Sequence, residues 1–297
     1  MIDVKERNIF IAVAAVVILG VVAFAAIRFS GSQDLFPVRV NGTYGYINRA
    51  GKIVINPQFE QAGTFADGLA PFRVGKIWGY IDTHGKVAIN PQFDFADPFS
   101  DGRAVVGLGR QFGYVERSGK YAINPQFEGA GRFSDGRAPV RSGKRWGYID
   151  KNGKTVVNPQ FDEAGGYSNG LALVRVGDRF GYIDKEGKMA INPQFEGAGE
   201  FSDGLALVQM AGKFGYIDKS GKLAINPQFQ EAGDFSDGLA FVVVGNRGGY
   251  IDKTGKIIIN PQFEKAGDFV RGLAPVWTGD RQGYINRDGM FVWNPSA

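Results

Sequence analysis

From residue 35 to residue 297 the chain repeats one pattern of apolar and polar positions every 34 residues. The averaged unit reads L-A-x-V-R-V-G-x-R-F-G-Y-I-D-K-x-G-K-x-x-I-N-P-Q-F-E-x-A-G-x-F-S-D-G. A constant period of this length is typical of repeat folds, in which neighbouring units share a core. The pattern therefore predicts eight units, the last one partial. Their Asn-Pro motifs begin at Asn56, Asn90, Asn124, Asn158, Asn192, Asn226, Asn260 and Asn294.

The fifth unit illustrates the elements that we expect in every copy. Branched apolar residues predict a strand over Leu171–Val176, and a second strand over Phe180–Asp184 follows a Gly-Asp turn. A hairpin turn with Asp and Gly leads to a third strand over Lys188–Asn192. Pro193 has no N–H for a sheet, so this strand is expected to stop there. Residues Gln194–Gly204 are expected to cross back to the next unit.

One unit is too small to fold alone. About eight large apolar side chains contribute roughly 2 kcal/mol each on burial, whereas ordering each residue costs about 1.5 kcal/mol. Two all-β arrays would share a core between units: an open β-solenoid of stacked three-stranded meanders, or an eight-bladed β-propeller with a fourth strand from the crossing segment. The solenoid is favoured because propeller blades usually need about 40–45 residues. Ala-Gly pairs such as Ala198-Gly199 are also poor strand formers.

The most apolar part of the chain precedes the repeats. Residues 9–27 form an uncharged run of 19 residues, which as a helix would be roughly 28 Å long and match a bilayer core. We therefore predict a transmembrane anchor over residues 9–27, a short cytoplasmic segment over residues 1–8 and a linker over residues 28–34. A cleaved signal peptide is the alternative, because Ala23-Phe24-Ala25 fits a small-x-small cleavage site.

Flanking charges give a weak orientation signal. Lys5 and Arg7 precede the apolar run, and Arg28 and Arg39 follow it. With the free amino terminus, this distribution slightly favours a cytoplasmic N-terminus. Under either reading the repeats are expected outside the cytoplasm, on the cell membrane or as a secreted or periplasmic protein.

Composition excludes several kinds of chemistry. There is no cysteine, so disulfides, thiolate metal sites and cysteine nucleophiles are excluded. The 34 basic residues exceed the 30 acidic residues by only 4, which does not indicate a nucleic-acid partner. Glycine occurs 44 times, but neither phosphate-binding glycine motif is present. We predict no cofactor.

The polar residues of the hairpin turns are better explained by structure than by catalysis. The single histidine, His84, occupies a turn position that varies freely between units, and one histidine without cysteine does not indicate a metal site. The turn aspartates lack the alternating oxygen ligands of a calcium loop, so we expect them to cap the turn. No unit gathers an acid, a base and a nucleophile, so we predict no enzyme. These aspartates are Asp82, Asp150, Asp184, Asp218 and Asp252.

Charged residues recur at both ends of the predicted meander. A row that contains Lys151 would suit anionic envelope polymers or lipids, but the traced chain returns acids such as Asp135 to the same end. The other end combines Arg145 and Arg179 with acids such as Asp162. We therefore expect solvated ion pairs at both ends.

Residues 78–82 and 146–150 both read Trp-Gly-Tyr-Ile-Asp. With the surrounding unit they resemble the WG repeat, also called KWG, which is found mainly in bacterial proteins. The resemblance covers residues 35–297 and implies no catalytic residues. A fainter similarity is to bacterial cell-wall-binding hairpin repeats. The Trp position departs from the family pattern in the other units, where it holds Tyr44, Phe112, Phe180, Phe214, Gly248 and Gln282.

This aromatic column and two nearby arginines are the candidate binding surface. The rings would either stack on sugars or pack between repeats, where an aromatic fills the space beside a glycine. We predict a non-catalytic, membrane-anchored extracytoplasmic module that binds a protein, a glycan or another envelope polymer. The alternative is a structural or sensory ectodomain that acts through the anchor. The candidate binding residues are Trp78, Trp146, Phe112, Phe180, Phe214, Arg145 and Arg179.

Overall fold

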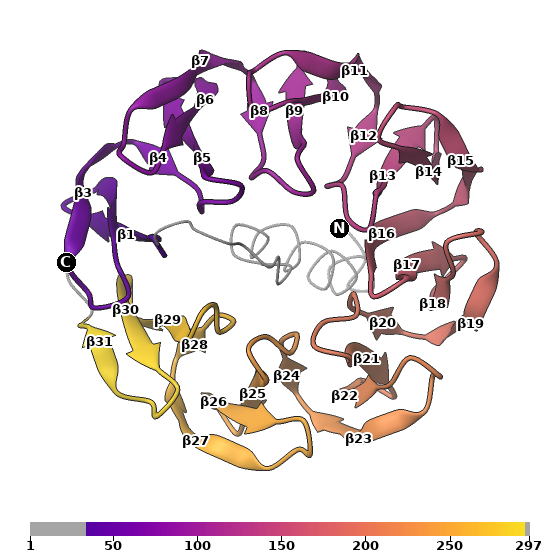
Figure 1. Ribbon diagram of the computed structural model, residues 1–297. Helices are drawn as coiled ribbons and strands as arrows, with labels where there is room; N and C mark the ends of the chain where they lie inside the picture. Colours follow the sequence, from indigo (N-terminus) through magenta and orange to yellow (C-terminus); the bar gives the residue numbers. More distant parts are fainter. Residues whose placement is uncertain (1–33, 295–297) are drawn as a thin grey trace, which may run out of the picture.

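The computed structural model describes residues 34–294, which form a ring of eight small antiparallel sheets (Figure 1). Side chains from around the ring line a central channel. Seven blades have four strands, and the first has three. The repeats therefore build an eight-bladed β-propeller, so the solenoid favoured by the sequence is wrong and its propeller alternative is correct. Within residues 34–294 no helix has the length and hydropathy to span a bilayer. The predicted anchor over residues 9–27 lies outside the described residues.

The strands follow the repeat period with little variation. The first four blades consist of β1 (Phe36–Val40), β2 (Thr43–Ile47), β3 (Ile53–Phe59); β4 (Gln61–Ala62), β5 (Leu69–Val74), β6 (Ile77–Asp82), β7 (Val87–Phe93); β8 (Phe95–Ala96), β9 (Ala104–Leu108), β10 (Gln111–Val115), β11 (Tyr121–Phe127); and β12 (Gly129–Ala130), β13 (Arg137–Ser142), β14 (Arg145–Asp150), β15 (Thr155–Phe161). The last four consist of β16 (Glu163–Ser168), β17 (Leu171–Val176), β18 (Arg179–Ile183), β19 (Met189–Phe195); β20 (Gly197–Ala198), β21 (Ala206–Met210), β22 (Lys213–Ile217), β23 (Leu223–Phe229); β24 (Glu231–Ala232), β25 (Leu239–Val244), β26 (Arg247–Asp252), β27 (Ile257–Phe263); and β28 (Lys265–Ala266), β29 (Leu273–Thr278), β30 (Arg281–Asn286), β31 (Phe291–Trp293).

The outermost strand of a blade continues through its proline. In β19, three residues around Pro193 lie opposite the single residue Gly181 of β18, between the flanking pairs Phe180↔Phe195 and Tyr182↔Ile191. Such a bulge leaves the proline outside the regular ladder, where its missing N–H costs nothing. The prediction that this strand ends at Asn192 is therefore wrong.

The glycine of the Gly-Tyr pair is what admits the bulge. A Cβ atom at Gly181 would lie 2.6 Å from the carbonyl oxygen of Ile191 and 2.7 Å from the nitrogen of Pro193. Any side chain at this position would collide with the bulged backbone. The two most constant dipeptides of the repeat, Gly-Tyr and Asn-Pro, are thus the two sides of one contact. The same crowding occurs at Gly45, Gly79, Gly113, Gly147, Gly181, Gly215 and Gly249.

The crossing segment provides the innermost strand. In the sixth blade this strand, β20, has only two residues and pairs with β21, and the N–H of Gly199 adds a 2.9 Å bond to the carbonyl of Leu207. A Cβ atom at Gly199 would lie 2.6 Å from a carboxylate oxygen of Asp234 in the next blade. The low strand propensity of Ala-Gly therefore did not prevent a strand here, because the strand is short and space beside the channel is scarce.

Adjacent blades are joined by a buried tyrosine. The hydroxyl of Tyr182 donates a 2.8 Å hydrogen bond to the carbonyl of Gly199, and its ring lies 4.9 Å from the ring of Phe201 in the next blade. Neither part of the side chain is exposed to solvent. The equivalent pairs are Tyr46–Phe65, Tyr80–Phe99, Tyr114–Phe133, Tyr148–Tyr167, Tyr216–Phe235 and Tyr250–Phe269.

Among residues 34–294, no strand is shared between the eighth and first blades, where the ring closes (Figure 1). Tyr284 takes its partners from the first blade: its hydroxyl donates to the carbonyl of Pro37 at 2.9 Å, and its ring lies 5.7 Å from that of Phe36. Phe36 stands where every other blade has alanine, so one larger side chain supplies the missing aromatic. These alanines are Ala70, Ala104, Ala138, Ala172, Ala206, Ala240 and Ala274.

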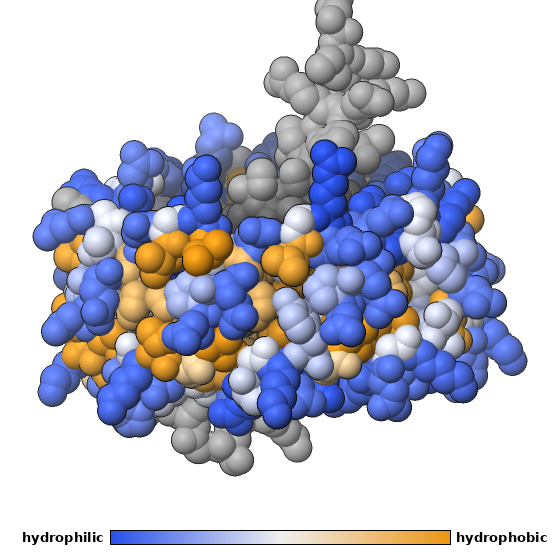
Figure 2. All heavy atoms as spheres, turned by 90° about the horizontal axis from the view of Figure 1, so that it is seen from above, coloured by the Kyte–Doolittle hydropathy of each residue, from blue (hydrophilic) through white to orange (hydrophobic). Residues whose placement is uncertain are grey.

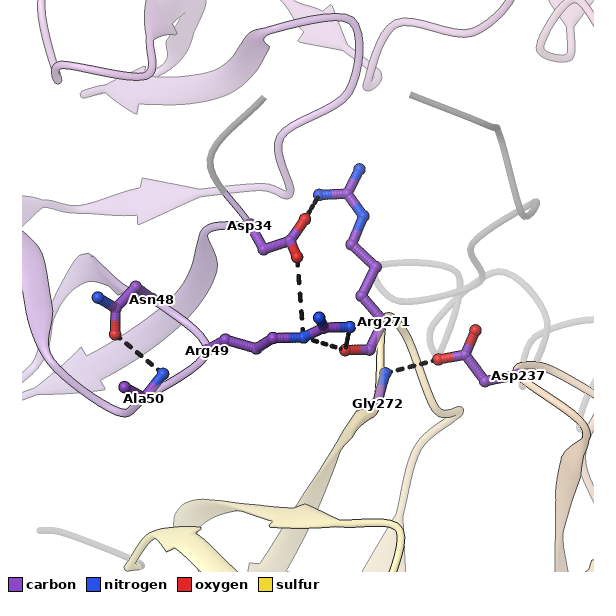
Figure 3. Close-up of polar contacts among 7 residues, drawn as sticks. All are labelled: Asp34, Asn48, Arg49, Ala50, Asp237, Arg271 and Gly272. Carbon is purple, nitrogen blue, oxygen red and sulfur yellow. Dashed lines mark hydrogen bonds and ion pairs between the residues drawn. The ribbon is translucent and has the colours of Figure 1, made fainter. Parts of the chain in front are cut away.

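Polar contacts at this seam also depart from the repeat (Figure 3). At five other junctions a turn aspartate accepts the N–H of a glycine in the next blade, as Asp237 does from Gly272 at 2.7 Å. The equivalent seam position holds Arg271, which forms a 2.5 Å ion pair with Asp34. Arg49 of the first blade donates to the carbonyl of Arg271 at 2.7 Å. The seam is therefore held by a different charge arrangement from the other junctions.

The outer wall carries apolar side chains between two polar rims (Figure 2). Some of them cover junctions between blades: Tyr121 packs edge-on against Phe93 at 6.3 Å, and Phe291 against Phe263 at 6.5 Å. The exposed apolar residues that begin the outermost strands are Ile53, Val87, Tyr121, Met189, Leu223, Ile257 and Phe291.

Ring closure can be tested by returning the seam to the repeat pattern. Phe36→Ala restores the alanine of the other blades but removes the aromatic partner of Tyr284. We expect it to lower the free energy of unfolding by about 3–5 kcal/mol, as for other buried phenylalanines, in a urea titration followed by circular dichroism. The exposed Val87→Ala should change it by less than about 0.5 kcal/mol. Equal stability of Phe36→Ala and the parent would contradict this account of closure.

Candidate functional site

The central channel has a volume of about 2620 Å³ and is lined by residues from around the ring. Pockets for small molecules usually measure roughly 300–1,000 Å³. The channel is therefore better suited to part of a polymer or a protein than to an enclosed small ligand.

Side chains on the channel wall differ from one blade to the next, whereas the side chains packed at the junctions of neighbouring blades are nearly constant. The clearest case is the residue directly before the buried aromatic of each crossing segment. It changes from neutral to basic to acidic around the ring, so it breaks the symmetry that the core preserves. From the second blade onward this column reads Thr64, Pro98, Arg132, Gly166, Glu200, Asp234 and Asp268.

The basic member of this column is neutralised by its neighbour. Arg132 donates two hydrogen bonds to the carboxylate of Asp97, at 2.6 and 2.7 Å. Glu200 accepts the N–H of Gly166, the position between it and Arg132 in the column. Burial raises the pKa of Glu200, while that hydrogen bond and the charge of Arg132 oppose the rise. Arg132 thus offsets the charge of Asp97 and favours the charged form of Glu200 on this part of the wall.

Asp234 and Asp268 have no such neutralising partner among the described residues. Burial within the ring, with repulsion from Asp268 and Glu200, raises the pKa of Asp234 to about 8. Burial raises the pKa of Asp268 to about 7. Both side chains are only half-buried, so channel water reaches them and moderates the cost of ionisation. No three acidic or histidine side chains of residues 34–294 are arranged to hold a metal ion.

The predicted aromatic residues lie between blades, near the turns that join β5 to β6 and their equivalents. We call this end of the ring the inner-hairpin face. Trp78 is half-buried, and the guanidinium of Arg73 lies 5.8 Å from its ring centre. Arg141 covers Trp146 in the same way at 5.9 Å. One face of each indole is therefore occupied by an arginine rather than free for a sugar.

Only part of the aromatic column reaches the channel. Trp78, Trp146 and Phe180 contribute to its wall, whereas Phe112 and Phe214 pack against the cores between blades.

The seventh blade, which has Gly248 in this column, shows what the aromatic side chain does. A Cβ atom at Gly248 would lie 2.1 Å from the ring of Phe241. The phenylalanine of the neighbouring strand thus fills the volume of the absent aromatic. Filling space is therefore one role of this column, and binding by it stays a prediction.

The two predicted binding arginines are exposed on the inner-hairpin face and paired. Arg145 lies 2.5 Å from Asp162, and Arg179 lies 3.8 Å from Glu196. The expected mixing of charges at both ends is confirmed, because Lys151 pairs with Asp101 at 2.9 Å at the opposite end.

Turn capping by the aspartate column is also confirmed. Asp82 accepts the N–H groups of His84 and Lys86 at 2.9 and 3.0 Å. The imidazole of His84 is largely exposed, with 77% of its side-chain surface accessible, as expected for a turn position.

Comparison with known families gives one assignment. A family model described as "WG containing repeat" matches residues 44–76, 78–109, 112–146, 146–179, 180–214, 214–247 and 249–279. The matches cover most of the chain. Comparison with curated proteins gives no match.

Solved structures share the fold at low sequence identity. BamB from Moraxella catarrhalis has a TM-score of 0.52 and 12% identity over 90% of this chain and 94% of its own. A eukaryotic initiation factor has a TM-score of 0.57 and 10% identity over 90% and 85%. The dihydro-heme d1 dehydrogenase NirN in complex with DHE has a TM-score of 0.59 and 14% identity over 92% and 76%. Such identities support the propeller fold and nothing more specific.

The channel carboxylates predict a pH dependence of stability. The pKa of Asp234 in the folded protein, about 8, exceeds the value near 3.9 expected after unfolding. Its contribution to stability is therefore present below about pH 4 and lost as the pH rises through about 8. We expect Asp234→Asn to raise the melting temperature relative to the parent more at pH 9 than at pH 5.

Asp218→Asn is the matched control, because its exposed turn carboxylate has a lowered pKa, mainly through its hydrogen bond from Ser220. The melting temperature of this variant should fall further below that of the parent as the pH rises through the acidic range. Parallel pH profiles for Asp234→Asn and the parent would show that the channel does not disfavour the charged carboxylate.

Proposed function

Because the chain belongs to the family of WG-containing repeat proteins, we propose that it is a non-catalytic binding module held outside the cytoplasm by its apolar N-terminal segment. The observation that carries the proposal is the contrast between a constant core and a varied surface. Tyr46 and its seven equivalents are conserved at every junction of the ring, whereas the channel column runs from Arg132 to Asp268. Repeat folds commonly bind through such varied surfaces on a constant frame.

The arrangement of charged groups favours binding over catalysis. Arg132 is engaged by Asp97. Asp234 and Asp268 form no ion pair within the described residues. The residues that line the channel with them include no histidine or cysteine, and Lys253 is the one lysine among them. An enzyme would need an acid, a base and a nucleophile within hydrogen-bond reach of one substrate position.

The extracytoplasmic location rests on the apolar run over residues 9–27. A bilayer anchor would tether the propeller by residues 28–34, and a cleaved signal peptide would release it. A structural or sensory ectodomain that acts through the anchor is the alternative. The partner would be an envelope protein, glycan or polymer.

Fractionation of the native protein tests the location. We expect the protein in the membrane fraction after carbonate washing, with Met1-Ile2 at its N-terminus and with protease-sensitive repeats in cells whose outer layers are opened. A mature N-terminus at Ala26 would replace the anchor by a signal peptide. Repeats protected from protease until the cytoplasm is opened would contradict an extracytoplasmic location.

The contribution of the aromatic column to binding is tested on isolated envelope fractions, with peptidoglycan and protein assayed separately. We expect Trp146→Ala to reduce retention on the binding fraction about tenfold, the scale of one lost interface anchor. Trp146→Phe should keep most of it, because Phe180 and Phe214 occupy the same position in other blades. Circular dichroism should show both variants folded. Unchanged retention for Trp146→Ala would limit this column to packing.

A further inference from the structure

The inner-hairpin face loses its regular charge pattern in the first three blades. In the other five blades, the residue that opens the strand after the turn is basic. In the first three blades the same position is uncharged, so the rim of ion pairs is interrupted there. This column reads Thr43, Ile77, Gln111, Arg145, Arg179, Lys213, Arg247 and Arg281.

Apolar side chains are exposed where the rim is interrupted. Val74 and Ile77 are paired across the hairpin of the second blade and are 53% and 40% exposed. In the third blade, Leu108 and Phe95 are 51% and 43% exposed. Other blades also expose an apolar residue at the position of Val74, but there it pairs with a basic neighbour, as Val176 does with Arg179. The second and third blades therefore present the broadest apolar surface of this face.

The third blade is adapted to display its phenylalanine. Phe95 lies beside Gly107 in the sheet, and a Cβ atom at Gly107 would lie 3.0 Å from the Cβ of Phe95 and 3.3 Å from the ring of Phe112. The glycine thus lets Phe95 rest against Phe112, with ring centres 5.7 Å apart. The equivalent positions in other blades are polar or glycine: Gln61, Gly129, Glu163, Gly197, Glu231 and Lys265.

Unpaired cations surround these apolar residues. Lys76, Arg110 and Lys144 occupy the turns of the second to fourth blades, where the fifth and eighth blades have Asp178 and Asp280. Within residues 34–294 neither these three side chains nor Arg73 has an ion pair or a hydrogen bond. Arg73 only stacks on Trp78.

The nearest acids of the same blades are already engaged. A carboxylate oxygen of Glu60 accepts the N–H of Gly75 at 3.1 Å, and one of Asp94 accepts the N–H of Gly109 at 2.7 Å. Both acids hold their hairpin turns in place. Within the described residues neither acid also forms an ion pair, whereas the equivalent Asp162 and Glu196 hold their turns and pair with Arg145 and Arg179. Lys76, Arg110 and Lys144 therefore remain available to a partner.

We propose that this surface, the basic–apolar patch, binds an acidic segment of a partner protein that carries apolar side chains. Lys and Arg attract carboxylates and set the approach of the partner, while buried aromatic, aliphatic and arginine side chains form the strong points of protein interfaces. A polyanionic glycan would use the cations but leave the aliphatic residues exposed. The patch consists of Arg73, Val74, Lys76, Ile77, Phe95, Leu108, Arg110 and Lys144.

The inference deepens the proposed function by naming a surface and a partner chemistry. The probe is a fluorescein-labelled 14-residue peptide in which Asp and Glu alternate with Leu and Phe, titrated with the full-length protein in detergent and followed by fluorescence anisotropy. A second peptide has Ser in place of every Leu and Phe, and a carboxylated glycan oligosaccharide serves as competitor. We expect the first peptide to bind at least about tenfold more tightly than the second, and the glycan to compete weakly.

Two variants divide the patch into its charge and its apolar part. Lys76→Asp with Arg110→Asp introduces the residue that the fifth blade already has at this turn, so the fold should tolerate it, and binding should weaken at least about tenfold. Ile77→Ser with Leu108→Ser should weaken binding about fivefold or more. Lys188→Asp with Lys219→Asp makes the same change of net charge at the opposite end of the ring, away from the channel wall, and should alter binding by less than about twofold.

Several results would overturn the inference. They are equal binding of the two peptides, equal competition by the glycan, equal loss in the Lys188→Asp/Lys219→Asp control, or no saturable binding of the acidic–apolar peptide. If the peptide fails while envelope retention persists, the binding function stands and its site lies elsewhere on the ring.

Discussion

The hydroxyl of each junction tyrosine donates a hydrogen bond to a carbonyl in the following blade, and the geometry of the ring depends on this bond. A buried hydroxyl without a partner would cost about 1–3 kcal/mol, so each blade must present a carbonyl at the position that the tyrosine of the preceding blade requires. Tyr182 and Gly199 show the repeated form of the contact. Tyr284 and Pro37 show that the same requirement is met at the seam by a different residue. The ring of Tyr284 also lacks the aromatic neighbour that other junctions provide, and Phe36 supplies one.

Local structure could be predicted from the sequence, and the closed ring could not. The strand over Leu171–Val176 and the capping of turns by aspartate depend on contacts within one unit, and both agree with the structure. The choice between a stack and a ring depends on the angle between neighbouring units, which the 34-residue period does not encode. Phe36 in a column of alanines was a readable sign of closure, because only a unit with a different neighbour needs a different residue. Pro193 was misread for a related reason: its strand continues because Gly181, on another strand, leaves room for the bulge.

The candidate site also has a part that the sequence predicts and a part that depends on ring closure. The exposed positions and mixed charges of Arg145 and Arg179 follow from the order of the strands, so they were predictable. The channel column was missed because its members stand 34 residues apart and meet only once the ring closes. Its signal in the sequence was variation: Arg132, Glu200 and Asp234 share one position in a unit that is otherwise nearly constant. Aromatic repetition is a different signal: Phe241 replaces the missing ring beside Gly248, so packing is one role of that column.

Repeat architecture constrains where a partner can be recognised. A change at Tyr182 would disturb a junction between blades, and a change at Gly181 would disturb the bulge within a blade. Neither position can therefore vary to recognise a partner without loss of the fold. The turns and the channel wall carry no such constraint, because their backbone bonds are satisfied whether the side chain is Lys76 or its equivalent Asp178. Uncharged residues replace the basic rim only at Thr43, Ile77 and Gln111, next to cations that no acid of the described residues neutralises. A concentration of departures on one side of one face is difficult to explain by packing, which treats all eight blades alike, and it is what selection for a single asymmetric partner would produce.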